Sequence, residues 1–331
     1  MSEERKEELV PLVSVCVITY NHEKYIRQCL DGILMQKVNF PYEILIHDDA
    51  SPDATADIIR EYEAKYPDII KPIYQTENQY SQGKSVSRFN NDRARGKYIA
   101  QCEGDDYWTD PGKLQMQVDF LEAHPEYVGT AHNVSCVNEF GEPIKHSDFS
   151  KLHPDYKYTI KEMEKHILPG HINSLLFRNI FLSLSDEIKN SYYSCNANGD
   201  EKIPLLLILH GNIWCSKEIM SVYRSVCRDG STNLSSERKG WDWNYRGYLH
   251  MLELAKFAKN NYDVTLDLKY ISEYNAAREL ITCLYSPTKE HRNNLKFLWR
   301  SADSKFNVIY YLFLIMPEYA KKFIKKMLSL N

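Results

Sequence analysis

The stretch Val13-Ser14-Val15-Cys16-Val17-Ile18 decides the fold, because it is a short, mostly β-branched apolar run near the start of the chain. Such a run predicts a buried strand. Polar residues follow at Thr19 to His22, where Asn21 can cap the next helix. In that helix the apolar side chains recur on one face, at Ile26, Cys29, Leu30, Ile33 and Leu34.

Strand and helix patterns alternate from this point to about residue 124. Further strands are predicted at Tyr42 to His47, Ile69 to Tyr74 and Lys97 to Cys102, and further helices from Ser51-Pro52, over residues 85–95 and from Asp110-Pro111. Short links between such elements predict an α/β fold with an open, mainly parallel sheet covered on both faces. Ligands of these sheets bind beyond the carboxyl ends of the strands. That edge comprises loops 19–22, 48–53, 76–84 and 103–110.

Composition narrows the possible functions. The chain has 331 residues and a net charge of −4 from 41 basic and 45 acidic residues, so nothing favours nucleic acid as a partner. None of the eight cysteines has CxxC spacing, which favours buried thiols over a zinc site. The charged N-terminus lacks the apolar core of a signal peptide, and the apolar run Val308 to Met316 is too short to span a bilayer. A cytoplasmic location is expected.

The segment Glu103-Gly104-Asp105-Asp106 places three carboxylates together after the fourth predicted strand. Like charges this close repel one another, and a divalent cation with a preference for oxygen ligands removes the conflict. The glycine would leave room for a bulky ligand beside the backbone. The alternative interpretation is a solvated acidic loop.

Two other acidic turns could also contribute chemistry. Asp48-Asp49 follows the second predicted strand, where a carboxylate could accept hydrogen bonds from a base or a sugar, or could simply cap a helix. Asp200 and Glu201 lie in the turn at 198–201 and qualify by residue type as a general base. A surface turn is the alternative for this pair.

Basic and aromatic residues elsewhere in the chain are further candidates for the functional site. Arg224 and Arg228, near the end of a predicted strand, could neutralise a leaving diphosphate, or could be ordinary surface arginines. His171, His132 and Trp108 are candidates for contact with an acceptor. Satisfied structural histidines are the alternative for the first two.

Three motifs taken together resemble the inverting glycosyltransferases of family 2. They are Val-Ile-Thr-Tyr-Asn at 17–21, His-Asp-Asp-Ala-Ser-Pro-Asp-Ala-Thr at 47–55 and Glu-Gly-Asp-Asp-Tyr-Trp at 103–108, and the resemblance covers about residues 12–228. It implies the GT-A fold and a bacterial-type polysaccharide or lipopolysaccharide sugar transferase. The expected catalytic domain spans residues 1–230, with a nucleotide-sugar half at 12–110 and an acceptor half at 111–230. A helical C-terminal extension is expected at 231–331.

The resemblance also implies how the donor is bound. Thr19, Tyr20 and Asn21 would line the nucleotide pocket, and Asp49 would bond the base, usually uracil. In the acidic segment, Asp105 and Asp106 match the family's DxD-type motif, one near the ribose and sugar and the other on Mn²⁺ or Mg²⁺. Glu103 replaces the usual first aspartate of that motif.

The remaining roles concern proton removal and the leaving group. Asp200 matches the catalytic base, before an apolar helix expected at Ile203 to Leu209, and Glu201 is its rival. Arg224 and Arg228 fall in a late loop that often meets the diphosphate. The acceptor wall is expected at His171 to Phe177.

The resulting hypothesis is direct displacement from a UDP-sugar by a hydroxyl of a glycan or lipid-linked acceptor. A non-catalytic sugar- or nucleotide-binding protein on the same fold is an alternative. A nucleotidyltransferase is another, although its glycine-and-basic phosphate loop is absent after the first strand, as is the glycine-rich turn of a dehydrogenase. The oligomeric state cannot be inferred from the sequence.

The C-terminal sequence suggests contact with the inner face of the cell membrane. Lys321, Lys322, Lys325 and Lys326 share one side of a predicted helix, and apolar residues lie toward another. A basic amphipathic helix can lie on an anionic membrane. The alternative is a helix packed on its own domain with solvated lysines.

Overall fold

The computed structural model describes residues 10–144, 152–226 and 243–328, without the side chains of residue 243 and residues 318–328. The chain divides into two compact units. Unit 1 comprises Met1–Thr159, Leu168–Ser194 and Asp200–Ser236, and unit 2 comprises Ile160–Ile167, Cys195–Gly199 and Glu237–Asn331. The expected domain boundary between residues 230 and 231 lies outside the described residues, and so does Arg228.

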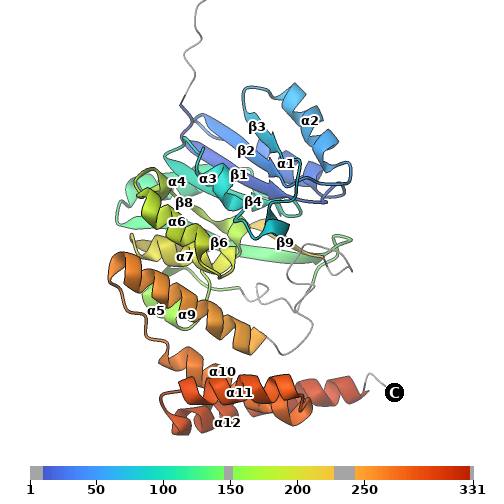
Figure 1. Cartoon of the computed structure of the whole chain (residues 1–331). Coiled ribbons are helices and arrows are strands. Elements are labelled where there is room, and N and C mark those ends of the chain that lie inside the picture. The colour runs from blue at the N-terminus through green and yellow to red at the C-terminus, as the bar shows by residue number, and fades with distance from the viewer. Residues whose placement is uncertain (1–9, 145–151, 227–242, 329–331) are drawn as a thin grey trace, which may run out of the picture. The chain divides into compact units, whose positions relative to one another are not determined.

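Unit 1 is built on one nine-stranded sheet (Figure 1). Its parallel part has the order β3 (Ile70–Tyr74), β2 (Tyr42–Asp48), β1 (Val13–Thr19) and β4 (Tyr98–Glu103). Next to β4, β8 (Leu176–Arg178) runs antiparallel to both β4 and β6 (Tyr127–Asn138), and β6 pairs in parallel with β9 (Asn212–Ser225). β5 (Tyr107–Trp108) and β7 (Tyr156–Tyr158) pair antiparallel with β9. The α/β class is confirmed, and the antiparallel pairings are an addition to it.

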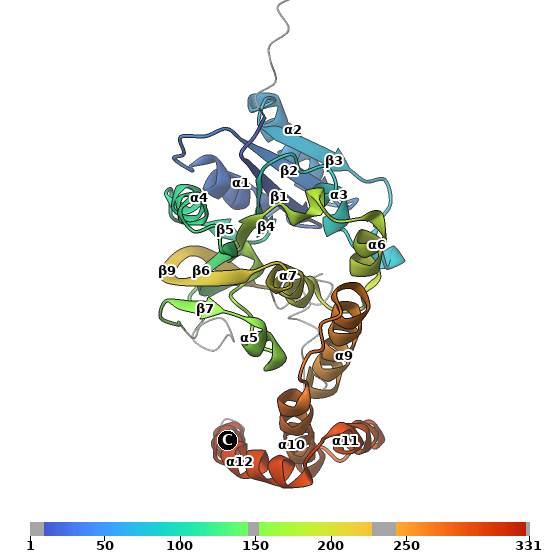
Figure 2. The same ribbon diagram turned by 90° about the vertical axis from the view of Figure 1, so that its left-hand side faces the viewer.

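Helices cover both faces of the parallel part, as Figure 2 shows for α1, α4 and α3. α1 (Ile26–Leu34), α2 (Thr55–Lys65) and α4 (Lys113–Ala123) share one core with alternate residues of the strands, including Val13, Val15 and Val17. α3 (Ser87–Asn91) packs on β1 and β2 and is shorter than the helix predicted over 85–95. This core therefore forms from apolar residues that recur at every second position in the strands and at every third or fourth position in the helices.

Two predicted helix caps are wrong. α2 begins at Thr55 instead of Ser51-Pro52, and Asn21 does not cap α1, whose first turn has no side-chain cap. Asn21 has a left-handed φ of 59° and its N–H donates to Ser51 Oγ at 3.0 Å. The Ser51 hydroxyl in turn donates to Asp48. The Ser51 side chain therefore joins the loop after β2 to the backbone of the loop after β1 instead of starting a helix.

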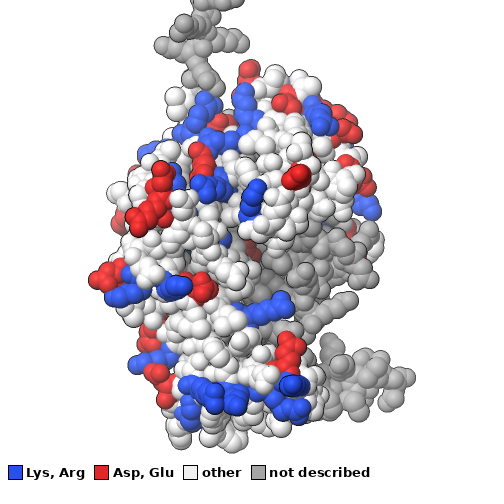
Figure 3. All heavy atoms as spheres, viewed as in Figure 1, with Lys and Arg blue, Asp and Glu red and all other residues white. Residues whose placement is uncertain are grey.

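The other helices lie in both units. They are α5 (Ile160–Glu164), η1 (Tyr80–Gln82), η3 (Ile172–Ser174), η4 (Ile180–Leu182), α6 (Asp186–Ser194), α7 (Gly199–Ile208), α9 (Trp243–Tyr262), α10 (Lys269–Tyr285), α11 (Lys289–Ser301) and α12 (Lys305–Leu328). In unit 2, α10 packs against α9, α11 and α12, which confirms a helical C-terminal region. On the face drawn in Figure 3, acidic and basic side chains are interspersed over unit 1. Of the helices described, none has the length and apolar character needed to cross a bilayer.

At Gly32, helix α1 packs closely against the backbone of Trp108. A Cβ at Gly32 would lie 2.7 Å from the carbonyl oxygen of Trp108 and 2.9 Å from its nitrogen. Alanine favours a helix over glycine by about 1 kcal/mol, whereas overpacking costs about 1–3 kcal/mol. Since both neighbours are backbone atoms, we expect Gly32→Ala to lower the free energy of unfolding by about 1 kcal/mol in urea titrations. Gly199→Ala is the control, because nothing lies within 4 Å of its Cβ; equal stability of the two variants would contradict the tight contact.

Candidate active site

The carboxyl ends of β1, β2 and β4 form one edge, because their registers bring Thr19 opposite Asp48 and Ile18 opposite Glu103. The Gly104 N–H donates to the carbonyl of Ile18 at 2.9 Å. A Cβ on Gly104 would lie 2.5 Å from Thr19 Oγ1. The glycine is therefore needed for close approach of the acidic loop to β1, not as the predicted space for a ligand.

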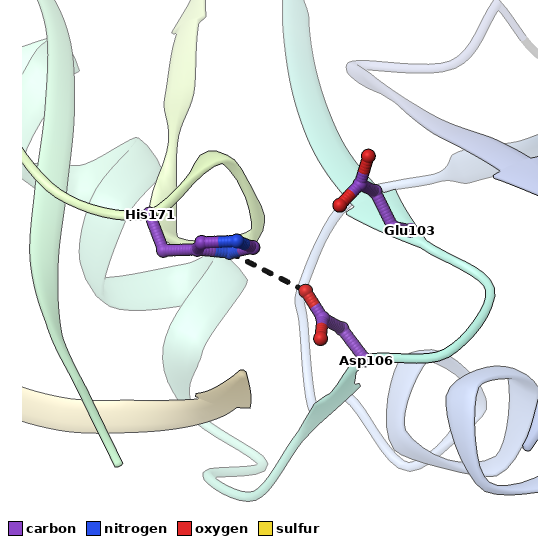
Figure 4. Close-up of side chains that lie close together, drawn as sticks. All are labelled: Glu103, Asp106 and His171. Carbon is purple, nitrogen blue, oxygen red and sulfur yellow. Dashed lines mark ion pairs between the residues drawn. The ribbon is translucent and has the colours of Figure 1, made fainter. Parts of the chain in front are cut away.

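Glu103, Asp106 and His171 form a cluster at this edge (Figure 4). One ligand atom from each lies within 4.8 Å of the others, and Asp106 Oδ2 is 3.3 Å from His171 Nδ1. Asp106 and His171 are buried and Glu103 is half-buried. Two carboxylates and an imidazole are suitable ligands for a divalent transition metal. The sequence predicted the carboxylates as part of a metal site but assigned His171 only to the acceptor.

Hydrogen bonds fix the orientation of the Asp106 carboxylate. Its Oδ1 accepts the backbone N–H of Arg224 at 2.8 Å, and its Oδ2 accepts the side-chain amide of Asn173 at 3.0 Å. Asn173 is itself oriented by the Ser221 hydroxyl, which donates to its Oδ1 at 2.9 Å. Asp106 therefore joins the acidic loop to η3 and β9. The sequence placed Asn173 only within the expected acceptor wall at 171–177, because no local pattern marks it as a partner of Asp106.

The charge of Asp106 is costly in this setting. Burial, followed by repulsion from Asp105 and Glu103, raises the pKa of the Asp106 carboxyl well above its ordinary value of 3.8. A cation among these groups would offset both effects, so the donor set and the electrostatics fit a divalent metal. Asp105 lies to one side, with Oδ2 3.8 Å from His22 Nε2.

Arg224 is buried against the acidic loop. Its Nε donates to the carbonyl of Asp105 at 2.9 Å and its Nη2 to Gln28 Oε1 at 2.7 Å. Its guanidinium carbon lies 4.7 Å from the centre of the Tyr25 ring and 5.3 Å from that of Tyr107. The side chain is thereby held in one position, with its positive charge beside the carboxylates.

Asp49 holds the loop at 76–84 beside the carboxyl edge of the sheet. Its carboxylate accepts the backbone N–H groups of Gln79 and Tyr80 at 2.8 and 3.0 Å and lies 3.2 Å from His47 Nε2. This holds the start of η1 against the loop after β2. At the neighbouring position, burial is the main cause that raises the pKa of the Asp48 carboxyl. Tyr20 is half-buried at the end of β1.

Two candidates for acceptor contact point into the interior. Trp108 is 2% exposed, and its indole N–H donates to the carbonyl of Asn173 at 3.0 Å. The Lys113 ammonium lies 4.0 Å from the centre of the Trp108 ring. His132 is fully buried in β6, and its Nε2 has no hydrogen-bond partner among the described residues. Desolvation is the main cause that lowers the pKa of His132.

Residues 199–201 of the predicted acidic turn belong to a helix. Asp200 and Glu201 occupy the first turn of α7, which begins at Gly199 rather than at Ile203 as predicted. Acidic side chains stabilise that end of a helix. Asp200 is half-buried, whereas Glu201 is 2% exposed.

The raised pKa of Asp106 predicts a pH dependence for the metal-free protein. Its folded state binds the proton more tightly than its unfolded state, so this contribution to stability is complete below about pH 4 and is lost as pH rises through the folded pKa. With chelator present, the stability of the wild type should therefore fall relative to Asp106→Asn as pH rises from 5 to 8. Mn²⁺ should restore the wild type only. A constant difference between the two proteins across this pH range would contradict the raised pKa.

Comparison with known proteins agrees with this geometry. The sequence profile of Glycosyl transferase family 2 matches residues 14–183, just over half of the chain. An uncharacterized protein of Mycobacterium tuberculosis is 36% identical over 252 residues, which cover 73% of this chain and 67% of that protein.

Two solved structures share the fold. One is S. aureus TarS 1–349 in complex with UDP-GlcNAc, with a TM-score of 0.59, 18% identity and coverage of 86% of this chain and 79% of that one. The other is the mannosyltransferase PcManGT from Pyrobaculum calidifontis with GDP-Man and Mn²⁺, with a TM-score of 0.50, 18% identity and coverage of 92% and 85%. With the profile match, the GT-A fold and the acidic cluster at its carboxyl edge, this chain belongs to glycosyltransferase family 2.

Proposed function

We propose that this glycosyltransferase moves a sugar from a UDP-sugar to a hydroxyl of a glycan or lipid-linked acceptor in cell-surface polysaccharide synthesis, with inversion. The observation that carries the proposal is the cluster of Glu103, Asp106 and His171 beside the loops after β1 and β2. The fold neighbours TarS and PcManGT were solved with UDP-GlcNAc and with GDP-Man and Mn²⁺, which supports a nucleotide-sugar donor.

The acidic segment would hold the metal. We assign Asp106 and Asp105 as ligands, as the motif implies, and add Glu103 and His171 from the observed cluster. The imidazole favours Mn²⁺ over Mg²⁺, since Mg²⁺ binds almost wholly through oxygen. A bound divalent cation would supply charge neutralisation for the departing diphosphate. The fixed guanidinium of Arg224 adds positive charge to the same loop.

The loops after β1 and β2 would receive the nucleotide. Thr19, Tyr20 and Asn21 lie at the end of β1, and Asp49 holds the backbone of the loop at 76–84. Both Asp49 oxygens already accept backbone N–H groups, and Oδ1 also lies 3.2 Å from His47 Nε2, so the second lone pair of Oδ2 remains for the base. Asp49 therefore contributes both to the shape of the pocket and to base recognition.

Asp200 is the better candidate for the general base. A base must reach the acceptor hydroxyl, and Asp200 is half-buried whereas Glu201 is almost inaccessible. In the proposed step the carboxylate takes the hydroxyl proton as the oxygen bonds to the anomeric carbon. The bond from that carbon to the diphosphate oxygen breaks on the opposite face, so the configuration inverts.

Donor and metal binding can be tested together by thermal shift. We expect UDP and UDP-sugars to raise Tm in the presence of Mn²⁺ and to have little effect with chelator. His171→Ala should lower the affinity for Mn²⁺ by about tenfold or more, because loss of a group that supports a metal site has an effect of that size. His124→Ala, an exposed histidine of the same unit, is the matched control.

The outcome separates several possibilities. Slow hydrolysis of a UDP-sugar with Mn²⁺ would distinguish the enzyme from a non-catalytic binder. If UDP raises Tm equally with and without chelator, and equally in the wild type and in His171→Ala, the metal assignment is wrong. A larger shift with another nucleoside diphosphate would overturn UDP as the donor nucleotide.

The base assignment predicts a separation of binding from turnover. Asp200→Asn should lower the transfer rate by about 10²–10⁴-fold while donor affinity remains, because general base catalysis contributes on that scale. Glu201→Gln is the rival variant and is expected to act mainly on stability, since its side chain is buried. Full transfer activity in Asp200→Asn, with loss in Glu201→Gln, would exchange the two assignments.

A further inference from the structure

α12 presents a stripe of large apolar side chains to solvent. Phe306 is 78% exposed and Phe313 70%, and the other members are Ile309, Tyr310, Leu314 and Met316. Spacings of three and four residues place them along one side of the helix. A contiguous exposed stripe of this kind marks an interaction surface.

α11 contributes a row of basic side chains. Its members are all exposed and recur every three or four residues, at Lys289, Arg292, Lys296 and Arg300. Figure 3 shows Lys and Arg side chains gathered over this helix. Among the described residues, none of the four forms an ion pair. Their charges are therefore available to an anionic partner.

Both helices pack on the same helix of unit 2. Each packs against α10, as Figures 1 and 2 show, and α11 also contacts α9, where the ring centres of Phe297 and Tyr245 lie 5.4 Å apart. Phe297 on α11 is also partly exposed, at 38%. The apolar stripe and the basic row therefore belong to two helices that pack on the same partner, α10.

The sequence concentrates positive charge in this region. Residues 286–331 contain nine Lys or Arg and three Asp or Glu, a net charge of +6, while the whole chain carries −4. The other residues therefore carry −10. Four of the nine are the lysines at 321, 322, 325 and 326, in the last turns of α12. Such asymmetry indicates an anionic partner for this end of the chain.

We propose that α11 and α12 form a docking surface for an anionic lipid bilayer, with the apolar stripe of α12 in the interface and the basic row of α11 at the headgroups. A bilayer offers apolar depth and negative charge together. A second copy of the chain would bring two positive surfaces into contact, and a nucleic acid would leave the apolar stripe in water. This inference goes beyond the proposed function and needs neither its donor nor its metal.

Vesicle flotation of the full chain tests the proposal. We expect binding to vesicles of phosphatidylcholine with phosphatidylglycerol, weak binding to phosphatidylcholine alone, and loss of binding at high salt. The double variant Phe306→Ser and Phe313→Ser should reduce the bound fraction about tenfold, because it removes the most exposed apolar area. Arg292→Gln with Lys296→Gln should remove the preference for anionic vesicles.

Matched controls keep the result specific to this surface. Leu182→Ser with Phe140→Ser removes apolar side chains that are 67% and 71% exposed in unit 1, and should bind vesicles as the wild type does. Thermal shift with UDP and Mn²⁺ should be the same in all variants, so failure of docking and failure of the donor assignment give different results. Equal flotation of the wild type and the phenylalanine double variant would overturn the proposal. A dimer in light scattering that this variant abolishes, without vesicle binding, would assign the surface to a second copy.

Discussion

The buried Asp106 carboxylate is the constraint on which the rest of the site depends. It accepts one hydrogen bond from the backbone of β9 and one from Asn173 in η3, while its own backbone belongs to the loop after β4. Three segments that are far apart in the sequence therefore meet at one side chain. A buried carboxylate with fixed donors keeps its geometry before any ligand arrives, and such preorganisation is what an electrostatic site requires.

Positive groups around the acidic loop limit the repulsion without cancelling it. Arg224 is tied to the carbonyl of Asp105 and stacked near two tyrosines, so its charge cannot move toward a ligand. Burial, followed by repulsion from Asp105 and Glu103, still raises the pKa of the Asp106 carboxyl well above its ordinary value. A site in this state favours a mobile cation over further fixed ones, because the cation can arrive together with the anionic diphosphate.

The first half of the fold could be predicted because its signals are local. The strands β1, β2 and β4 are largely apolar, and the helices α1, α2 and α4 repeat apolar residues at helical period. The strands β5 and β8 have two and three residues, too few to show any period, and their partners are remote in sequence. The roles of His171 and Asn173 depend on those pairings, so residue type alone could not assign them. Asn21 and Ser51 were misjudged for a related reason: their usual role is local capping, and here each bonds across two loops.

Charge is divided along the chain in a way that bears on how the enzyme works. The residues before 286 carry a net charge of −10, although they hold the site for an anionic nucleotide. Such a charge opposes the approach of a free nucleotide diphosphate and favours one that is already paired with a divalent cation. The net +6 of the last 46 residues has the opposite effect on any anionic surface. Under the two proposals, donor approach and surface attraction would therefore depend on charges of opposite sign in different parts of the chain, and added salt would screen both.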